Sequence, residues 1–255
     1  MKRTPVMGAA RTTDRTSHIA RVLWSLLLLF VAPTAIAASL QVAPTSLFID
    51  AERNADGLTL SNSGAQSLYA QVRVFRWSQV DGEDRLEPTT DVAISPPMVE
   101  LPPGGEQLVR VIRLISPPTE MESSYRVIVD EIPTQDADDD QRLRFVLRYS
   151  VPIFLSPLNL SVGPVLHTTL TREADETFLE VRNEGSAHAQ LADLVLVSGT
   201  NRHFIAPGLA GYVLPGQQRR WLLPADLVLD VNGDFKARVN AELVERTLAP
   251  VATLR

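Results

Sequence analysis

The chain has 255 residues, 24 Lys and Arg side chains against 30 Asp and Glu, 18 prolines and no cysteine. The absence of cysteine excludes disulfides, thiolate zinc sites, iron–sulfur clusters and cysteine nucleophiles. The net charge of −6 argues against a general nucleic-acid-binding protein, which normally presents a basic face. A hydrophobic content of 45 % is sufficient for a core, and the length fits one large or two small domains.

The N-terminal residues 1–37 have the pattern of a secretory signal peptide. Five basic residues and one acidic residue precede the apolar run VLWSLLLLFV of residues 22–31. Ala35 and Ala37 are small residues at the two positions that a signal peptidase reads. A membrane anchor is the alternative, but the run is short for a span of about 20 residues. We therefore predict export without stable membrane insertion after cleavage, and a mature chain with a net charge of −10.

The next region shows strand signals in chain order. Alternating or β-branched runs occupy residues 68–77, 108–115, 125–132 and 142–155. Turn clusters rich in Asn, Gly and Pro separate them at intervals of roughly 8–15 residues, which is typical of a β-sandwich. No segment of helical length has an apolar helical stripe. These signals predict a first all-β domain over residues 38–157.

A second, smaller all-β domain is predicted over residues 158–255. Ser156-Pro157 is the expected hinge, because proline does not continue a central strand. Asn232-Gly233 is a dipeptide favoured in tight hairpin turns. The strand-like runs of this block are residues 158–165, 178–183, 190–197, 208–221 and 228–244.

The residues able to bind a metal are scattered. His167, His188 and His203 lack the short spacing of a metal site, so structural or surface roles are expected. The acidic run DADDD of residues 136–140 offers carboxylates to calcium. It lacks the glycine turn and distal glutamate of a calcium loop, which favours a solvated hairpin tip. We predict no metal site.

A catalytic centre is equally hard to assemble. Asp130 and Glu131 are adjacent in a predicted strand and therefore point to opposite faces, unlike a glycosidase pair. The sequence contains no nucleophile elbow and no phosphate-binding loop. We predict that the protein is not an enzyme. An exported carbohydrate-active enzyme, with carboxylates from distant loops, stays open as an alternative.

One strand has an unusual pattern. Residues 142–151 alternate between an apolar face and a face with three arginines. An ordinary core strand would show the same alternation. This strand, however, follows the acidic run and precedes the hinge, which predicts a position at a sheet edge. An exposed apolar edge risks aggregation unless a partner covers it, and it suits pairing with a strand of another protein. The apolar face comprises Leu143, Phe145, Leu147, Tyr149 and Val151.

Three stretches carry a family resemblance. In order and spacing, residues 95–111, 125–133 and 151–157 resemble the periplasmic pilus-assembly chaperones of the chaperone–usher pathway, the PapD-like family. The second domain is similar more loosely, at residues 181–185 and 214–216. The segment VFRWSQVDGEDRLEPT resembles the sequences of the archaic branch of this family, which serves Csu-type or spore-coat-U-like pili.

The resemblance implies two immunoglobulin-like β-sandwich domains in a boomerang arrangement and a periplasmic location. It implies a chaperone that binds, folds and caps pilus subunits by donor-strand complementation and delivers them to an outer-membrane usher. No ATP or other cofactor is implied. The N-terminal strand, here Leu40 to Ile49, usually joins the clamp. By position the donor residues are Leu143, Phe145 and Leu147, and we extend the set to Tyr149 and Val151.

The sequence also departs from the family. Family members often hold the subunit's terminal carboxylate with an Arg and a Lys, where this chain has Ser46 and Pro152, and their interdomain Arg is Ser156 here. If the last two strands form a hairpin, Arg126 and Arg148 are expected to be approximate neighbours and to bind a carboxylate. Solvated arginines are the alternative interpretation. The alternative function is an exported structural or adhesive β-sandwich protein of a surface fibre.

Overall fold

The computed structural model describes residues 39–133, 146–159, 163–227 and 233–248. The described residues contain strands and no helix, and thus no helix that could cross a membrane. The predicted leader, the acidic run, Leu143 and Phe145 lie outside the described residues. Residues 38–255 contact one another closely enough to form one compact unit.

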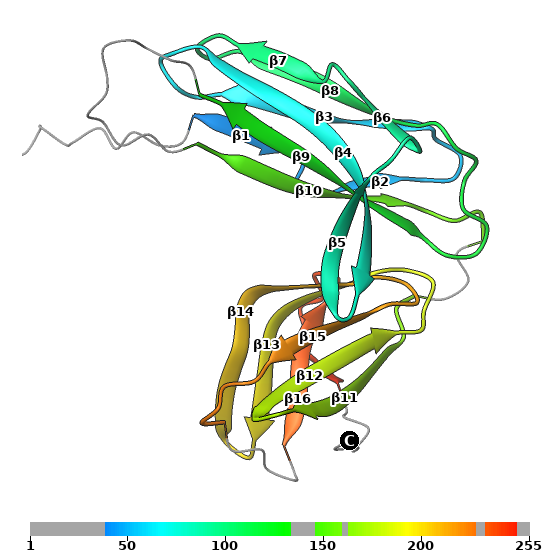
Figure 1. Cartoon of the computed structure of the whole chain (residues 1–255), viewed down its shortest axis with the longest axis vertical. Helices are drawn as coiled ribbons and strands as arrows, with labels where there is room; N and C mark the ends of the chain where they lie inside the picture. The colour runs from blue at the N-terminus through cyan, green and yellow to red at the C-terminus, as the bar shows by residue number, and fades with distance from the viewer. Residues whose placement is uncertain (1–38, 134–145, 160–162, 228–232, 249–255) are drawn as a thin grey trace, which may run out of the picture. The chain divides into compact units, whose positions relative to one another are not determined.

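Two sheets built from the first half of the chain face each other (Figure 1). The four-stranded sheet has the order β1-β3-β8-β6, with strands Leu40–Ala43, Ala55–Asn62, Glu106–Arg113 and Val92–Ser95. The other sheet has the order β2-β10-β9-β4-β5, with strands Leu47–Ile49, Arg148–Leu155, Ser123–Ile132, Leu68–Val80 and Glu83–Pro88. Strand β7, Met98–Leu101, also pairs with β4.

The alternation read from the sequence forms the first core. In β4, Leu68, Ala70 and Val72 are buried, whereas Tyr69 and Gln71 between them are exposed. A period of two places successive side chains on opposite faces of a sheet. The resulting core unites buried leucines, isoleucines and valines from both sheets, as a protein without disulfides requires.

Two further sheets come from the second half of the chain. One has the order β11-β12-β15, with strands Leu166–Glu173, Glu176–Asn183 and Gln218–Leu222. The other has the order β14-β13-β16-β17, with strands Asn201–Val213, Ala189–Ser198, Asp234–Val239 and Arg246–Leu248. They enclose a separate core. The all-β class is thereby confirmed. The run at residues 158–165 contains no strand in its described part, and β11 follows it instead.

The two sandwiches share an Asn-x-Gly corner. Asn62 and Asn183 are almost fully buried, and each side-chain oxygen accepts a hydrogen bond of 2.9 Å from the backbone of Gly64 or Gly185. Each side-chain amide group also donates to backbone carbonyls of its own sandwich. Buried polar groups need such partners, so both corners fix the start of a turn.

A third buried cluster draws on strands of both sandwiches and consists of Trp77, Phe154, Tyr212 and Leu214. The ring of His188 lies parallel to Phe154, with 3.6 Å between the ring centroids. Its Nδ1 lies 2.8 Å from a carboxylate oxygen of Glu122. His188 thus has a structural role. These contacts lie beside Ser156, whose amide donates to the Ile49 carbonyl.

Candidate functional site: the open edge of strand β10

Strand β10 is paired along its whole length on one side only. Strand β9 pairs with every residue from Arg148 to Leu155, whereas β2 pairs, in parallel, only with Ile153–Leu155. The prediction of a simple edge strand is therefore refined. In the part of the chain that the structure describes, residues 148–152 have one edge without a strand partner. Figure 1 shows β9 and β10 running side by side.

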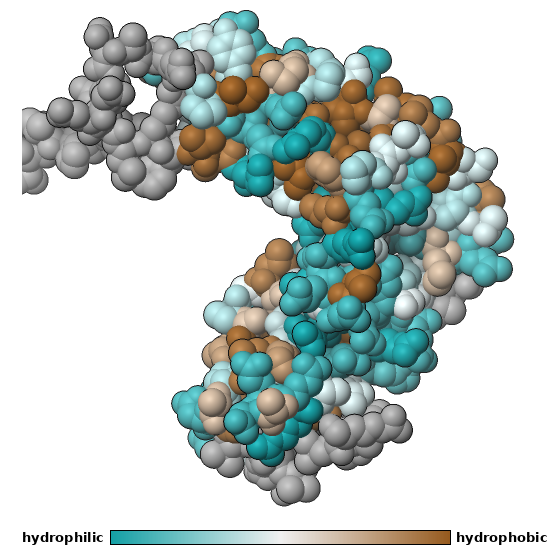
Figure 2. Space-filling model, in the orientation of Figure 1, coloured by the Kyte–Doolittle hydropathy of each residue, from teal (hydrophilic) through white to brown (hydrophobic). Residues whose placement is uncertain are grey.

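The open edge separates two kinds of surface. On its inner face Val151 is buried, and Leu147 and Tyr149 are half-buried against the first core. On its outer face Arg148 and Ser150 are exposed. Val146, just before β10, is 50 % exposed. Hydrophobic residues reach the surface of the first sandwich where β10 begins (Figure 2).

A tyrosine hydroxyl connects this edge to the edge of β1. The Ser39 carbonyl accepts a hydrogen bond from the Ser63 amide beside β3, so the next carbonyl, of Leu40, is directed away from β3. The Tyr149 hydroxyl donates to that Leu40 oxygen at 2.6 Å. No pattern in the sequence indicates this bond, because 109 residues separate its partners.

The register separates the two arginines that we expected to be neighbours. Arg126 lies opposite Pro152, and Arg148 lies opposite Asp130. These positions are four residues apart along β10, which corresponds to about 13 Å. The expected Arg126–Arg148 fork is not formed. Strand β9 pairs with residues of β10 that lie four positions later in the chain than the expected hairpin would place them.

Arg148 is engaged by a carboxylate of the neighbouring strand. Its Nε pairs with one oxygen of Asp130, and Nη2 of Arg73 binds the other oxygen at 2.6 Å. Burial would raise the pKa of Asp130, but hydrogen bonds from Arg148 and Arg73 outweigh it and lower the pKa. Asp130 therefore stays ionised and positions both guanidinium groups.

Arg126 has a different environment. Its guanidinium carbon lies 3.7 Å from the centroid of the Trp77 ring and 5.4 Å from that of Tyr212. Nη1 donates to the Ser150 carbonyl at 3.3 Å. Burial lowers the pKa of Arg126, and Asp84 partly opposes this. A guanidinium has five donors, so this geometry leaves donors for a carboxylate at the open edge.

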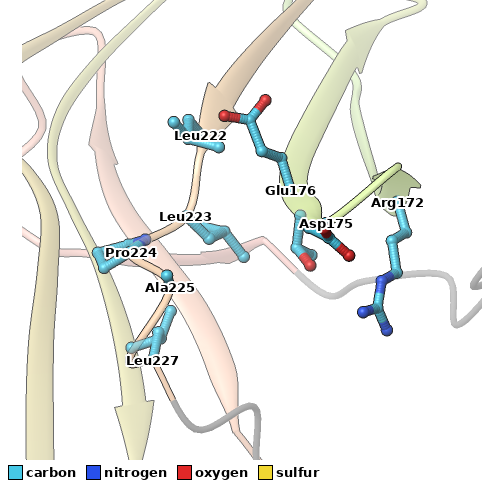
Figure 3. Close-up of a pocket in the computed structure, with 9 residues that line it drawn as sticks. Arg172, Asp175, Glu176, Leu222, Leu223, Pro224, Ala225 and Leu227 are labelled. Carbon is cyan, nitrogen blue, oxygen red and sulfur yellow. The ribbon is translucent and has the colours of Figure 1, made fainter.

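A pocket of about 430 Å³ in the second sandwich is the alternative site. Figure 3 shows that the carboxylates of Asp175 and Glu176 point apart rather than toward one point. They do not resemble the facing pair of a glycosidase. No group of three metal-binding side chains occurs among the described residues. The pocket is lined by Arg172, Asp175, Glu176, Thr177, Leu222, Leu223, Pro224, Ala225 and Leu227.

Comparisons with known proteins concern both the sequence and the fold. Residues 39–161 match the family described as pili and flagellar-assembly chaperone, PapD N-terminal domain. No curated protein matches the chain significantly in sequence.

Solved structures show the same fold at low identity. A complex of the chaperone CsuC with the tip subunit CsuE, from archaic Csu pili of Acinetobacter baumannii, has a chain with 23 % identity and a TM-score of 0.66, covering 82 % of this chain and 97 % of that one. The YadV chaperone has 17 % identity, a TM-score of 0.59 and coverages of 78 % and 93 %. The Pseudomonas aeruginosa CupB2 chaperone has 18 % identity and a TM-score of 0.56, and the match covers 82 % of this chain and 100 % of that one.

Proposed function

Because the family match over residues 39–161 places this chain among the PapD-like chaperones of pilus assembly, we propose that it acts in the periplasm on pilus subunits. It binds, folds and caps them by donor-strand complementation and delivers them to an outer-membrane usher. The observation that carries the proposal is the open edge of β10, which combines backbone without a strand partner with an apolar inner face. Backbone hydrogen bonds then supply affinity, and alternate side chains supply specificity. No enzymatic activity and no cofactor belong to this function.

We assign the donor residues to the apolar side chains that alternate in the sequence up to and into β10. Leu147 and Tyr149 are half-buried in the free protein, so a partner gains area by covering them. Full burial of an exposed apolar side chain contributes about 1.5–3 kcal/mol, so each half-buried side chain contributes a fraction of this before the cost of ordering the chains. The complete set is Leu143, Phe145, Leu147, Tyr149 and Val151.

We assign the candidate carboxylate anchor to Arg126. It lies opposite Pro152, beside the position where the family often carries a cation, and it is held against Trp77. Arg148 already pairs with Asp130 and lies about 13 Å further along the strand. A terminal carboxylate that reaches Arg126 would form a charge-assisted hydrogen bond in a half-buried setting.

Coexpression tests the function. The chain is produced together with a pilus subunit, and complexes are purified from the periplasmic fraction. We expect the combination Leu143→Asp with Phe145→Asp to abolish the complex, since it places charge on the donor face. Leu86→Asp, at an exposed site on β5, is the matched control and should leave it intact. Undiminished complex with the double variant would refute donor-strand binding.

Fractionation separates the proposal from the alternative of a fibre component. A chaperone remains in the periplasm after the pilus is assembled. A structural or adhesive protein would be recovered outside the cell, together with the fibre.

A further inference from the structure

The outer face of the sheet beside the open edge carries a row of arginines. We define the basic strip as Arg73 of β4, Arg126 of β9 and Arg148 of β10. The register pairs Arg73 with Ile128 and Arg148 with Asp130, which puts all three arginines on the face opposite the core. Asp130 pairs with Arg73 and Arg148, and the three arginines and Asp130 together carry a net charge of +2.

The strip presents its cations rather than its carboxylate. The side chains of Arg148 and Arg73 are 69 % and 44 % exposed, whereas that of Asp130 is 17 % exposed. The two arginines bind different oxygens of Asp130 and cover it. A molecule that approaches the open edge therefore meets guanidinium groups. This is a local reversal of sign on a chain whose net charge is −6.

A strand that pairs with residues 148–152 places its side chains alternately on the two faces. Those directed inward meet Tyr149 and Val151. Those directed outward lie within cross-strand reach of Arg148. We infer that the pairing segment of the pilus subunit alternates apolar residues with Asp or Glu, its carboxylates lying on the side of the basic strip. The inference rests on the proposed function and specifies the chemistry of the partner strand.

The size of the effect follows from the exposure of the strip. An opposite-charge pair across two strands changes a dissociation constant by about 1.5- to 5-fold. Because Arg148 is solvent-exposed, salt screens this attraction, and the effect is confined to low ionic strength. Charge at the strip thus selects among subunits, while the apolar face supplies most of the affinity.

The experiment measures the dissociation constant of the chain and its coexpressed subunit at low and high NaCl. We expect Arg148→Gln to weaken binding by about 1.5- to 5-fold at low salt and to have no effect at high salt. Arg85→Gln on β5 is the matched control, because that side chain is also exposed and paired with a carboxylate. It should leave binding unchanged at both salt concentrations.

Two synthetic peptides of equal length test the partner chemistry directly. One alternates Val with Glu, and the other alternates Val with Lys. We expect the Glu peptide to compete with the subunit better than the Lys peptide at low salt. Equal competition, or equal binding by Arg148→Gln and Arg85→Gln, would overturn the inference. Failure of the proposed function is distinguishable, because the unchanged chain would then capture no subunit.

Discussion

Replacing Tyr149 by Phe removes one hydroxyl and keeps the ring that packs on the first core. In the free protein this hydroxyl donates to the carbonyl of Leu40, a fully buried residue, at 2.6 Å. That carbonyl is the acceptor that β1 turns toward the open edge. Under the proposed function, a subunit strand that pairs with β1 would supply a backbone N–H to the same oxygen. The hydroxyl bond would then belong to the free protein and be replaced in the complex.

The magnitude follows from one neutral hydrogen bond. Its loss lowers the free energy of unfolding of the free protein by about 0.5–1.5 kcal/mol. If the complex replaces the bond in this way, the same free energy appears as tighter binding. We expect Tyr149→Phe to lower the dissociation constant for the subunit by about 2- to 12-fold.

Urea unfolding, hydrogen exchange of the β1 amides and subunit affinity check this prediction. Tyr149→Phe should unfold at lower urea concentration, exchange faster in β1 and bind more tightly. Tyr69→Phe, at an exposed site on β4 where the hydroxyl bonds to the exposed Glu100, is the control and should change neither the exchange of the β1 amides nor the subunit affinity. If Tyr149→Phe is less stable but binds the subunit more weakly, the hydroxyl acts in the complex and the reasoning is wrong.

Three further predictions concern stability and are checked by urea unfolding. Asn183→Ala should cost about 3 kcal/mol, because its buried amide makes four hydrogen bonds with the backbone; a cost below that of an exposed substitution would contradict the corner's role. Phe154→Ala should cost about 3–5 kcal/mol by leaving a cavity in the third cluster, and Phe154→Leu should cost less. Burial raises the pKa of Asp91, but hydrogen bonds from Tyr125 and Arg76 among others outweigh burial and lower the pKa overall. Ionised Asp91 therefore stabilises the fold above the unfolded pKa of 3.8, and this contribution is lost as the pH falls below that value. Asp91→Asn should therefore be less stable at pH 7 and should lose less stability on acidification to about pH 3 than the unchanged chain.

The sandwich class could be predicted because strand periodicity is local. A period of two fixes which residues share a face whatever the sheet order, so the alternation around Tyr149 and Val151 follows from the sequence. Strands that lack this alternation of apolar and polar residues were not predicted from the sequence. In β5, EDRLEP, every residue is exposed, and β11, LHTTLTRE, is mostly polar, so neither shows an apolar face to a reader of the sequence.

Register and long-range pairing could not be predicted. The separation of Arg126 and Arg148 depends on how many residues the connection between β9 and β10 consumes, and each residue shifts the partner by one position. The parallel pairing of Leu47 with Ile153 joins segments more than a hundred residues apart. The roles of His188 and of the Tyr149 hydroxyl likewise depend on tertiary contacts that no local pattern encodes.

The two edges of the larger sheet are treated in opposite ways. An unpaired edge invites association with other chains, and charged residues are a common protection. Strand β5 follows this rule with four charged side chains in six exposed residues. The opposite edge is only partly closed: β2 covers three residues of β10, and one tyrosine hydroxyl satisfies the facing carbonyl of β1. If the unpaired edge of β10 had no function, we would expect it to carry charged side chains as β5 does. The contrast within one sheet, with apolar side chains kept at the less protected edge, favours selection of that edge for a partner strand.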